Sequence, residues 1–182
     1  MLDLELETQR LILRPPVRED FDGYAALVAD EEAARFIGGH LPRAAAWRKF
    51  LQMPGAWMIQ GFGMFSVLEK ASGEWIGQMG PWHLEGWPGT EVGWAFRRSA
   101  WGRGYATEAA TVAMDWAVDH LGWTDVIHSI NPDNLASHAL AQRLGSHNRG
   151  PGRLPAPFED VAIDIWGQTR EQWRARRMGA AA

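Results

Sequence analysis

The 182-residue chain contains no cysteine, and this absence removes several kinds of chemistry at once. Disulfide scaffolds, zinc sites built from thiolates and a cysteinyl acyl-enzyme all need that side chain. Any acyl transfer by this protein is therefore expected to be direct or to use an oxygen nucleophile. The six histidines are dispersed, with neither HxH nor HExxH spacing, so we expect no metal site.

Long apolar runs and long basic runs are also missing. Nothing approaches the length of a membrane span, and the acidic start MLDLELETQ does not resemble a signal peptide. We therefore expect a cytoplasmic protein without a membrane partner. The net charge of -4 argues against nucleic acid and favours a cationic substrate such as an amine. The chain length predicts a single domain over residues 1–182. We expect this domain to be a monomer or a homodimer.

Tryptophan, by contrast, is abundant, with eleven residues. They are scattered over nearly every expected element rather than gathered on one platform, so most are expected in the core or its rim. Trp82 and Trp87 are the best candidates for lining a substrate pocket. The basic C-terminal cluster is expected to be the solvated face of a short terminal helix, and it comprises Arg170, Arg174, Arg176 and Arg177.

Apolar spacing predicts antiparallel strands first and strand-helix alternation afterwards. In the first half, strands are expected at 10–14, 62–69, 74–82 and 91–96, and helices at 18–30 and 44–53. The second half is expected to form a helix at 107–121, a strand at 125–130 and a helix at 134–144. Residues 150–157 (GPGRLPAP) are expected to be a loop.

A glycine turn at 101–110 (WGRGYATEAA) joins the strand at 91–96 to the long helix. Gly102 and Gly104 have no Cβ to block an anion, so backbone N-H groups can converge on a phosphate, helped by the helix dipole. No Gly-Lys-Ser/Thr follows, which excludes a Walker loop, and the chain order does not fit a dinucleotide fingerprint. A glycine pair alone also fits a simple tight turn. In this context it predicts a ligand carrying phosphate or pyrophosphate.

Four ordered segments resemble the GNAT superfamily of acetyl-coenzyme A dependent N-acetyltransferases. The family's pyrophosphate loop reads Gln/Arg-x-x-Gly-x-Gly/Ala; here Gly104 and Ala106 hold the last two positions and Trp101 replaces the Gln or Arg. The form WGxGYAxEA is similar to the branch that includes ribosomal-protein N-terminal (alanine) acetyltransferases. The other three segments are TQRLILR at 8–14, NPDNLASHALAQRLG at 131–145 and WGQTREQW at 166–173.

The resemblance implies an α/β fold whose central mixed sheet has about six to seven strands, is flanked by helices and is splayed between strands four and five. It also implies acetyl-coenzyme A as cosubstrate, with pantetheine pairing to the freed backbone of the fourth strand, where Gly93 fits a bulge. The residues it assigns to the cosubstrate are Trp94, Ala95, Phe96, Trp101, Gly102, Arg103, Gly104, Tyr105, Ala106, Thr107, Asn134 and Ser137.

The catalytic residues are less clearly marked. Acetyl transfer to an amine needs a group that accepts the ammonium proton. Glu91, which opens the fourth strand, is the first candidate and His83 the second, while Glu85, Glu159 and ordered water stay open. The developing oxyanion can be held by a main-chain N-H near Ala95.

Protonation of the departing thiolate is a separate question. Many superfamily members carry a Tyr seven residues beyond the Asn, but this chain has Ala141 there. In the resembled branch a Ser three residues after the Asn is proposed for this task, which points to Ser137, although helix capping also accounts for Asn134. The expected acceptor is a protein N-terminus or a small-molecule amine. A non-catalytic acyl-coenzyme A binding or sensing domain and a nucleotide-binding α/β protein are the alternatives.

Overall fold

The computed structural model describes residues 4–180, which form two compact units. The first unit contains residues 4–80 and 94–112, and the second contains residues 81–93 and 113–180. Three elements run from one unit into the other: β4 (Trp75–Trp82), β5 (Glu91–Phe96) and α5 (Tyr105–Asp119). Residues 1–3, with which the acidic N-terminal segment begins, lie outside the described part.

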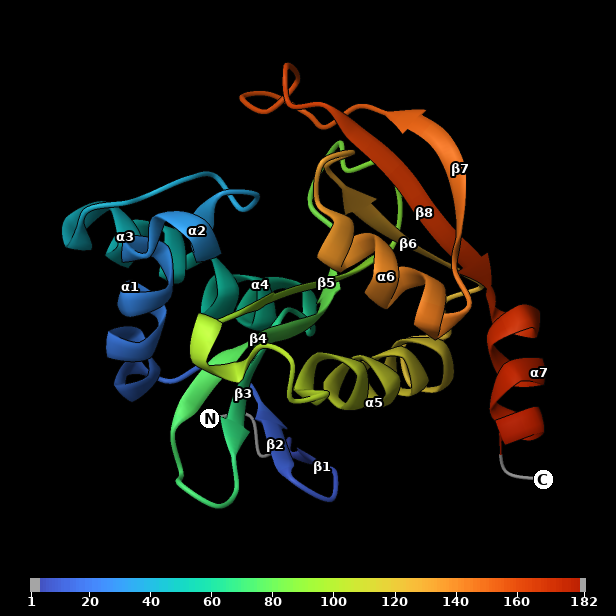
Figure 1. The fold of residues 1–182 in the computed structure, drawn as a ribbon, viewed down its shortest axis with the longest axis horizontal. Helices are drawn as coiled ribbons and strands as arrows, with labels where there is room; N and C mark the ends of the chain where they lie inside the picture. Colours follow the sequence, from blue (N-terminus) through green and yellow to red (C-terminus); the bar gives the residue numbers. More distant parts are fainter. Residues whose placement is uncertain (1–3, 181–182) are drawn as a thin grey trace. The chain divides into compact units, whose positions relative to one another are not determined.

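Antiparallel strands make up the sheet of the first unit (Figure 1). Strand β2 pairs with β1 and β3, and β3 pairs with β4. Alternation in β2 directs Leu11 and Leu13 inward, and both are fully buried. The bounds are β1 (Leu6–Glu7), β2 (Leu11–Arg14) and β3 (Phe65–Glu69).

Four helices are grouped together in this unit (Figure 1). They are α1 (Phe21–Ala29), preceded by the short η1 (Arg18–Asp20), then α2 (Glu31–Ala34), α3 (Arg43–Phe50) and α4 (Gln52–Gln60). Tyr24 of α1 packs on Phe50 of α3, with ring centroids 5.4 Å apart. The single helix expected at 44–53 was wrong. Pro54 lies in the first turn of α4, where its missing N-H costs no helical bond, so helix continues to Gln60.

The second unit contains three antiparallel strands and two helices. Strand β8 (Ile163–Thr169) lies between β6 (Asp125–Ile130) and β7 (His147–Gly152). The helices are α6 (Leu135–Leu144) and α7 (Arg170–Ala180). The loop expected at 150–157 was wrong in its first three residues, which belong to β7. As an edge strand with a shifted register between Asn148 and Pro151, β7 tolerates a proline.

The strand order is β1-β2-β3-β4-β5-β6-β8-β7, which gives eight strands instead of six to seven. The α/β class with a mixed, helix-flanked sheet is confirmed: Glu91 of β5 is in parallel register with Ile127 of β6. The unpredicted strands are β1, with two residues, and β7, whose sequence HNRGPG has few strand-forming residues. The described residues include no helix that is long and apolar enough to cross a membrane.

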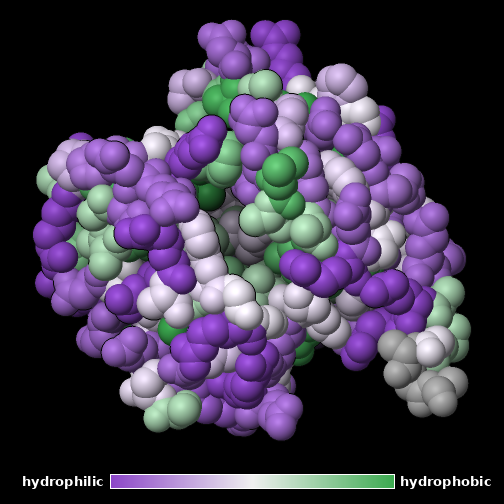
Figure 2. Space-filling view, in the orientation of Figure 1, coloured by the Kyte–Doolittle hydropathy of each residue, from purple (hydrophilic) through white to green (hydrophobic). Residues whose placement is uncertain are grey.

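Helix α5 carries the alanine face that its sequence predicts. Ala109, Ala110, Ala113 and Ala117 are fully buried, so small side chains allow close packing along the helix. On the outside of the molecule hydrophilic residues predominate on the face in Figure 2, and hydrophobic residues form small separate groups.

Candidate active site

The turn between β5 and α5 has the backbone geometry of an anion site. Gly102 and Gly104 have φ angles of +70° and +78°, which side chains with a Cβ rarely adopt. The N-H of Glu108 donates to the Gly104 carbonyl over 3.1 Å and so makes the first bond of the helix. The N-H groups just before it have no acceptor within the helix and point toward its N-terminus, where an anion is favoured.

Trp101 braces the start of this turn. Its Nε1-H donates to the carbonyl of Phe96 over 2.9 Å, while 47% of the residue is exposed. The short η2 (Arg98–Ala100) lies between the two residues. An indole N-H therefore ties the turn to the end of β5 at the position where the resembled family has Gln or Arg.

Main-chain groups of β5 alternate between its two edges. The N-H of Arg97 donates to Ile76 of β4 over 3.0 Å, and the Ala95 carbonyl would lie 2.6 Å from a Cβ on Gly77. Ala95 therefore directs its main-chain groups toward β4. Trp94 and Phe96 direct theirs to the opposite edge, in agreement with the bond from Trp101 to Phe96.

Glu91, the first candidate base, is buried in the second unit with 7% of its surface exposed. Burial raises the pKa of its carboxyl, and a 2.7 Å hydrogen bond from Trp87 Nε1 opposes that shift without cancelling it. Ser129 of β6 also favours the ionised form of Glu91. The buried Ser129 hydroxyl nevertheless does not meet the distance and angle criteria of a hydrogen bond. The result is a desolvated carboxyl group, and its raised pKa makes the ionised form a stronger base than a solvated carboxylate.

The other candidate bases have a different environment. His83, Glu85 and Glu159 are all exposed, so solvent screens each of them. Of the two tryptophans singled out for a pocket, Trp82 is buried and Trp87 contacts Glu91. In the second unit, the structure therefore brings together Glu91 and Trp87.

Asn134 caps helix α6 as its sequence predicts. Its side-chain Oδ1 accepts from the N-H of Ser137 over 3.1 Å, and Ser137 occupies the third helical position with a half-buried side chain. Gly145 ends the helix with a φ of +90°. Ala141 is fully buried, so no acidic group stands at the position where many superfamily members have Tyr.

A buried polar network in the second unit escaped prediction. His128 Nδ1 lies 2.7 Å from the Val92 carbonyl, so this nitrogen carries the proton, and Nε2 accepts from the hydroxyl of Ser146 over 3.0 Å. Gln168 Nε2 donates to both Ser146 and the Leu144 carbonyl, each over 3.0 Å. Burial lowers the pKa of His128 to about 4, so the imidazole is neutral at neutral pH.

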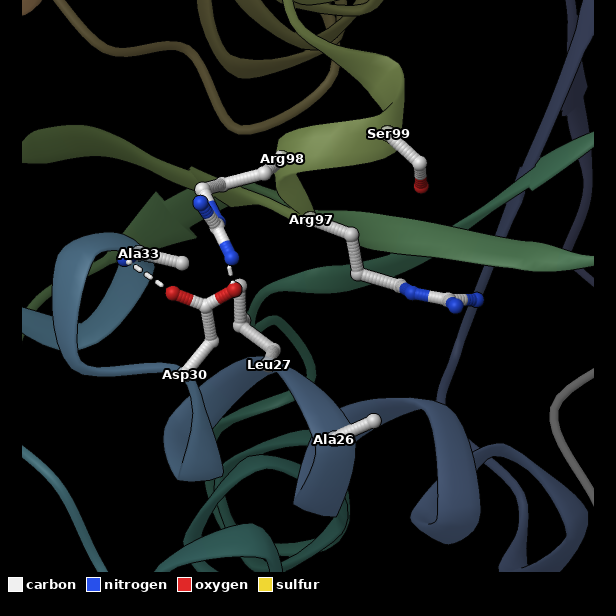
Figure 3. Close-up of a pocket in the computed structure, with 7 residues that line it drawn as sticks. All are labelled: Ala26, Leu27, Asp30, Ala33, Arg97, Arg98 and Ser99. Atoms are coloured by element: carbon white, nitrogen blue, oxygen red, sulfur yellow. Dashed lines mark hydrogen bonds and ion pairs between the residues drawn. The ribbon is translucent and has the colours of Figure 1, made fainter.

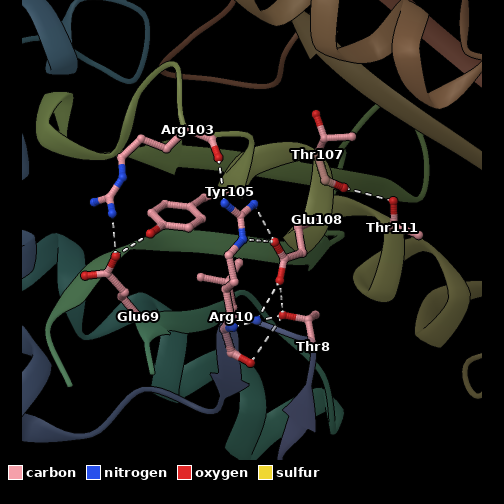
Figure 4. A network of polar contacts seen from close by, with 9 residues as sticks. Thr8, Arg10, Glu69, Arg103, Tyr105, Thr107, Glu108 and Thr111 are labelled. Carbon is pink, nitrogen blue, oxygen red and sulfur yellow. Dashed lines mark hydrogen bonds and ion pairs between the residues drawn. The ribbon is translucent and has the colours of Figure 1, made fainter. Parts of the chain in front are cut away.

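A second unpredicted group lies behind the glycine turn in the first unit. Side chains from the turn and from the first turn of α5 contact the loop between β1 and β2 and the end of β3, as Figure 4 shows. The residues involved are Thr8, Arg10 and Glu69, which meet Arg103, Tyr105 and Glu108. The co-occurrence of TQRLILR and WGRGYATEA in the sequence was the one signal that linked these segments.

A small cavity of about 250 Å³ also lies in the first unit, against η2. Arg98 reaches across it to Asp30 over 2.6 Å, whereas the Arg97 guanidinium points away from that pair (Figure 3). Ala26, Leu27, Ala33 and Ser99 complete the lining. The ion pair occupies the charged side of the cavity. Among residues 4–180, no group of His, Asp and Glu could hold a metal ion.

Comparison with known proteins agrees with this geometry. Residues 10–147 match the model of the Acetyltransferase (GNAT) domain, and the chain belongs to this family. The family's members transfer acetyl groups from acetyl-coenzyme A. An uncharacterized N-acetyltransferase, p20 of Bacillus licheniformis, is 27% identical over 88% of this chain and 92% of its own. Protein YkkB of Bacillus subtilis is 34% identical, but that match spans 48% of this chain and about half (52%) of YkkB.

Solved structures share the fold. An acetyltransferase from Agrobacterium tumefaciens has a TM-score of 0.80 and 30% identity, over 92% of this chain and 95% of its own. RimL, a ribosomal L7/L12 α-N-protein acetyltransferase in complex with coenzyme A, has a TM-score of 0.70 at 15% identity, over 91% of this chain and 98% of its own. The second likeness concerns the fold alone.

Proposed function

We propose that this protein moves an acetyl group from acetyl-coenzyme A directly to a primary amine, either a protein N-terminus or a small molecule. The single observation that carries the proposal is the turn with two left-handed glycines at the start of a 15-residue helix. The family match spans segments of both compact units. This supports one acetyltransferase domain over residues 1–182.

The cosubstrate is assigned to backbone more than to side chains. The pyrophosphate accepts hydrogen bonds from the N-H groups between Gly102 and Thr107, with Trp101 bracing the turn. Pantetheine runs along the edge of β5 that Trp94 and Phe96 face. By resemblance, Asn134 and Ser137 stay assigned to the pantetheine arm.

In the proposed reaction Glu91 takes a proton from the substrate ammonium, which frees the nitrogen lone pair. The nitrogen attacks the thioester carbonyl, and a main-chain N-H holds the oxyanion. Trp94 suits this role better than Ala95, whose N-H faces β4. The C-S bond then breaks, and Ser137 gives its hydroxyl proton to the coenzyme A thiolate. The nitrogen releases its second proton to the solvent as it becomes the amide, Ser137 recovers a proton from the solvent, and Glu91 passes the first proton to the solvent. Because the transfer is direct, both substrates bind together.

The acceptor can be identified by mass spectrometry. The protein is incubated with acetyl-coenzyme A and a panel of N-terminal peptides, polyamines, amino acids and aminoglycosides. A 42 Da mass increase, about that of one acetyl group, on one class of amine supports the proposal. An acetylated protein trapped without amine, or ping-pong kinetics, would contradict direct transfer.

A non-catalytic acyl-coenzyme A sensor is the second candidate. Ala141, buried where many superfamily members carry the acid, is the observation that favours it. Tight binding of acetyl-coenzyme A with no product across the whole panel would support the sensor, whereas turnover of any amine would exclude it.

A further inference from the structure

Arg10, between β1 and β2, lies directly behind the glycine turn (Figure 4). Its Nη1-H donates to the carbonyl of Arg103 over 2.9 Å. Its Nη2 lies 3.4 Å from the position of a Cβ on Gly104. The guanidinium therefore closes one side of the turn at the centre of the glycine motif.

The bond to Arg103 fixes the direction of the next N-H. The peptide between Arg103 and Gly104 is trans, and the C=O and N-H of a planar trans peptide point in opposite directions. Since the carbonyl points at Arg10, the N-H of Gly104 points away from it. Rotation of this peptide would break the bond to Arg10 and turn the N-H inward.

Glu108 holds Arg10 in this position from the first turn of α5. Its carboxylate accepts from the main-chain N-H of Arg10 over 2.9 Å and from Nε over 2.7 Å, and Thr8 adds its hydroxyl. Burial alone would raise the pKa of Glu108, but these hydrogen bonds outweigh it and hold the pKa below its usual value. Glu108 is therefore ionised and Arg10 is bound at both ends of its guanidinium.

Tyr105 fills the space beside Arg10. Its ring lies between two guanidinium groups, with Arg10 4.5 Å and Arg103 4.6 Å from the ring centroid. Its hydroxyl donates to Glu69, which also pairs with Arg103 over 2.8 Å. The Tyr105 hydroxyl and one guanidinium nitrogen of Arg103 are thus bonded to β3. In the proposed arrangement the backbone N-H groups of the turn face the ligand.

We propose that Arg10, held by Glu108, is a positioning residue that aims the Gly104 N-H at the pyrophosphate of the cosubstrate. The inference rests on the proposed function and adds a residue that contacts the turn from the side opposite the ligand. Arg10 acts through one peptide plane rather than by touching the phosphate. The contacts of Thr8 and Arg10 with Glu108 and Arg103 join the TQRLILR and WGRGYATEA segments in space.

The test compares coenzyme A affinity in Arg10→Met and in Arg149→Met by calorimetry. Arg149 forms a bidentate pair with Asp125 over 2.7 Å in the second unit, so its variant loses a similar ion pair while the bond from Arg10 to the Arg103 carbonyl stays in place. We expect Arg10→Met to bind coenzyme A at least about tenfold more weakly, as loss of one hydrogen bond to a charged group predicts. Arg149→Met should bind like the unmodified protein.

A second readout separates orientation from general stability. In NMR titrations with inorganic pyrophosphate, the Gly104 amide proton should move downfield in the unmodified protein and not in Arg10→Met. Arg10→Lys keeps the charge, but one ammonium cannot hold both Glu108 and the Arg103 carbonyl as the planar guanidinium does. Arg10→Lys should therefore bind coenzyme A as weakly as Arg10→Met. It can replace Arg10→Met in the test if that variant does not fold.

The outcomes are distinct. Full affinity in Arg10→Met, or full rescue by Arg10→Lys, would overturn the positioning role while leaving the proposed function intact. A protein with Arg10 in place that binds neither coenzyme A nor pyrophosphate would overturn both. Equal losses in the Arg10 and Arg149 variants would show a general effect of removing an ion pair, and would also overturn the inference.

Discussion

The glycine turn and the His128 network use polar groups in opposite ways. At the turn, the exposed Arg10 and Arg103 pair with Glu108 and Glu69, and such partly solvated pairs contribute little stability each. Around His128 the polar groups are buried, and a donor or acceptor left without a partner there is costly. The first region should therefore respond to mutation through ligand binding, and the second through folding.

Glu91 shares features of both regions, because it is buried like the His128 network and is also the proposed base of the reaction. Glu91→Gln keeps the shape and can still accept from Trp87, but it cannot take a proton. We expect kcat to fall by about 10² to 10⁴, with the free energy of unfolding nearly unchanged. The measurement is kcat with an active amine, with Glu85→Gln as comparison. An unchanged kcat in Glu91→Gln would remove Glu91 as the base.

The buried His128 imidazole should add a distinct component to the pH dependence of stability. A histidine whose pKa falls from 6.5 to about 4 on folding stabilises the folded state above pH 6.5, and that stability is lost as pH falls toward 4. The loss is about 3 kcal/mol. In urea unfolding, His128→Gln should lack this component, and His147→Gln, at an exposed position, is the matched control. The same pH dependence in both variants would contradict the buried neutral imidazole.

Replacing Ser137 tests whether its half-buried hydroxyl protonates the thiolate or has only a structural role. Ser137→Ala leaves the Asn134 cap intact because that cap uses the N-H of residue 137. We expect kcat to fall by more than about tenfold, with coenzyme A affinity little changed. If kcat stays the same with an active acceptor, the thiolate takes its proton from water.

The smallest effect is expected at Trp87. Its hydrogen bond to Glu91 favours the carboxylate, so Trp87→Phe should raise the pKa of Glu91 further. Because the ionised form is the base, the acidic limb of the pH-rate profile should move to higher pH. A limb that stays in place would mean that a group other than Glu91 controls it.

The two regions also differ in how far the sequence predicted them. The turn was predictable because its signal is local: two glycines and a helix start lie within a few residues of one another. The Arg10 brace joins residues 98 positions apart, and the His128 network joins β6 to the ends of α6 and β8. Such pairings depend on the register of strands, which a pattern of residue types does not supply.

The same reasoning applies to the fold. Strand β1 has two residues, too few to show alternation, and β7 contains Pro151 and glycines that are usual in loops. By contrast, β6 was predicted with its observed bounds, and α6 was predicted with one extra residue, its N-cap Asn134. A helix capped by Asn134 and ended by Gly145 is a strong local signal.

Coenzyme A binding by two glycine variants tests the central assignment most directly. Gly104→Val and Gly73→Val place the same side chain at φ angles of +78° and +71°, one in the turn before α5 and one in the turn between β3 and β4. Both carry a similar backbone strain, but only the first alters the turn assigned to the pyrophosphate, where the new Cβ would also lie 3.4 Å from Arg10 Nη2. By calorimetry, Gly104→Val should lose about a hundredfold in affinity while Gly73→Val binds normally. Unchanged affinity in a folded Gly104→Val protein would contradict a pyrophosphate site at this turn.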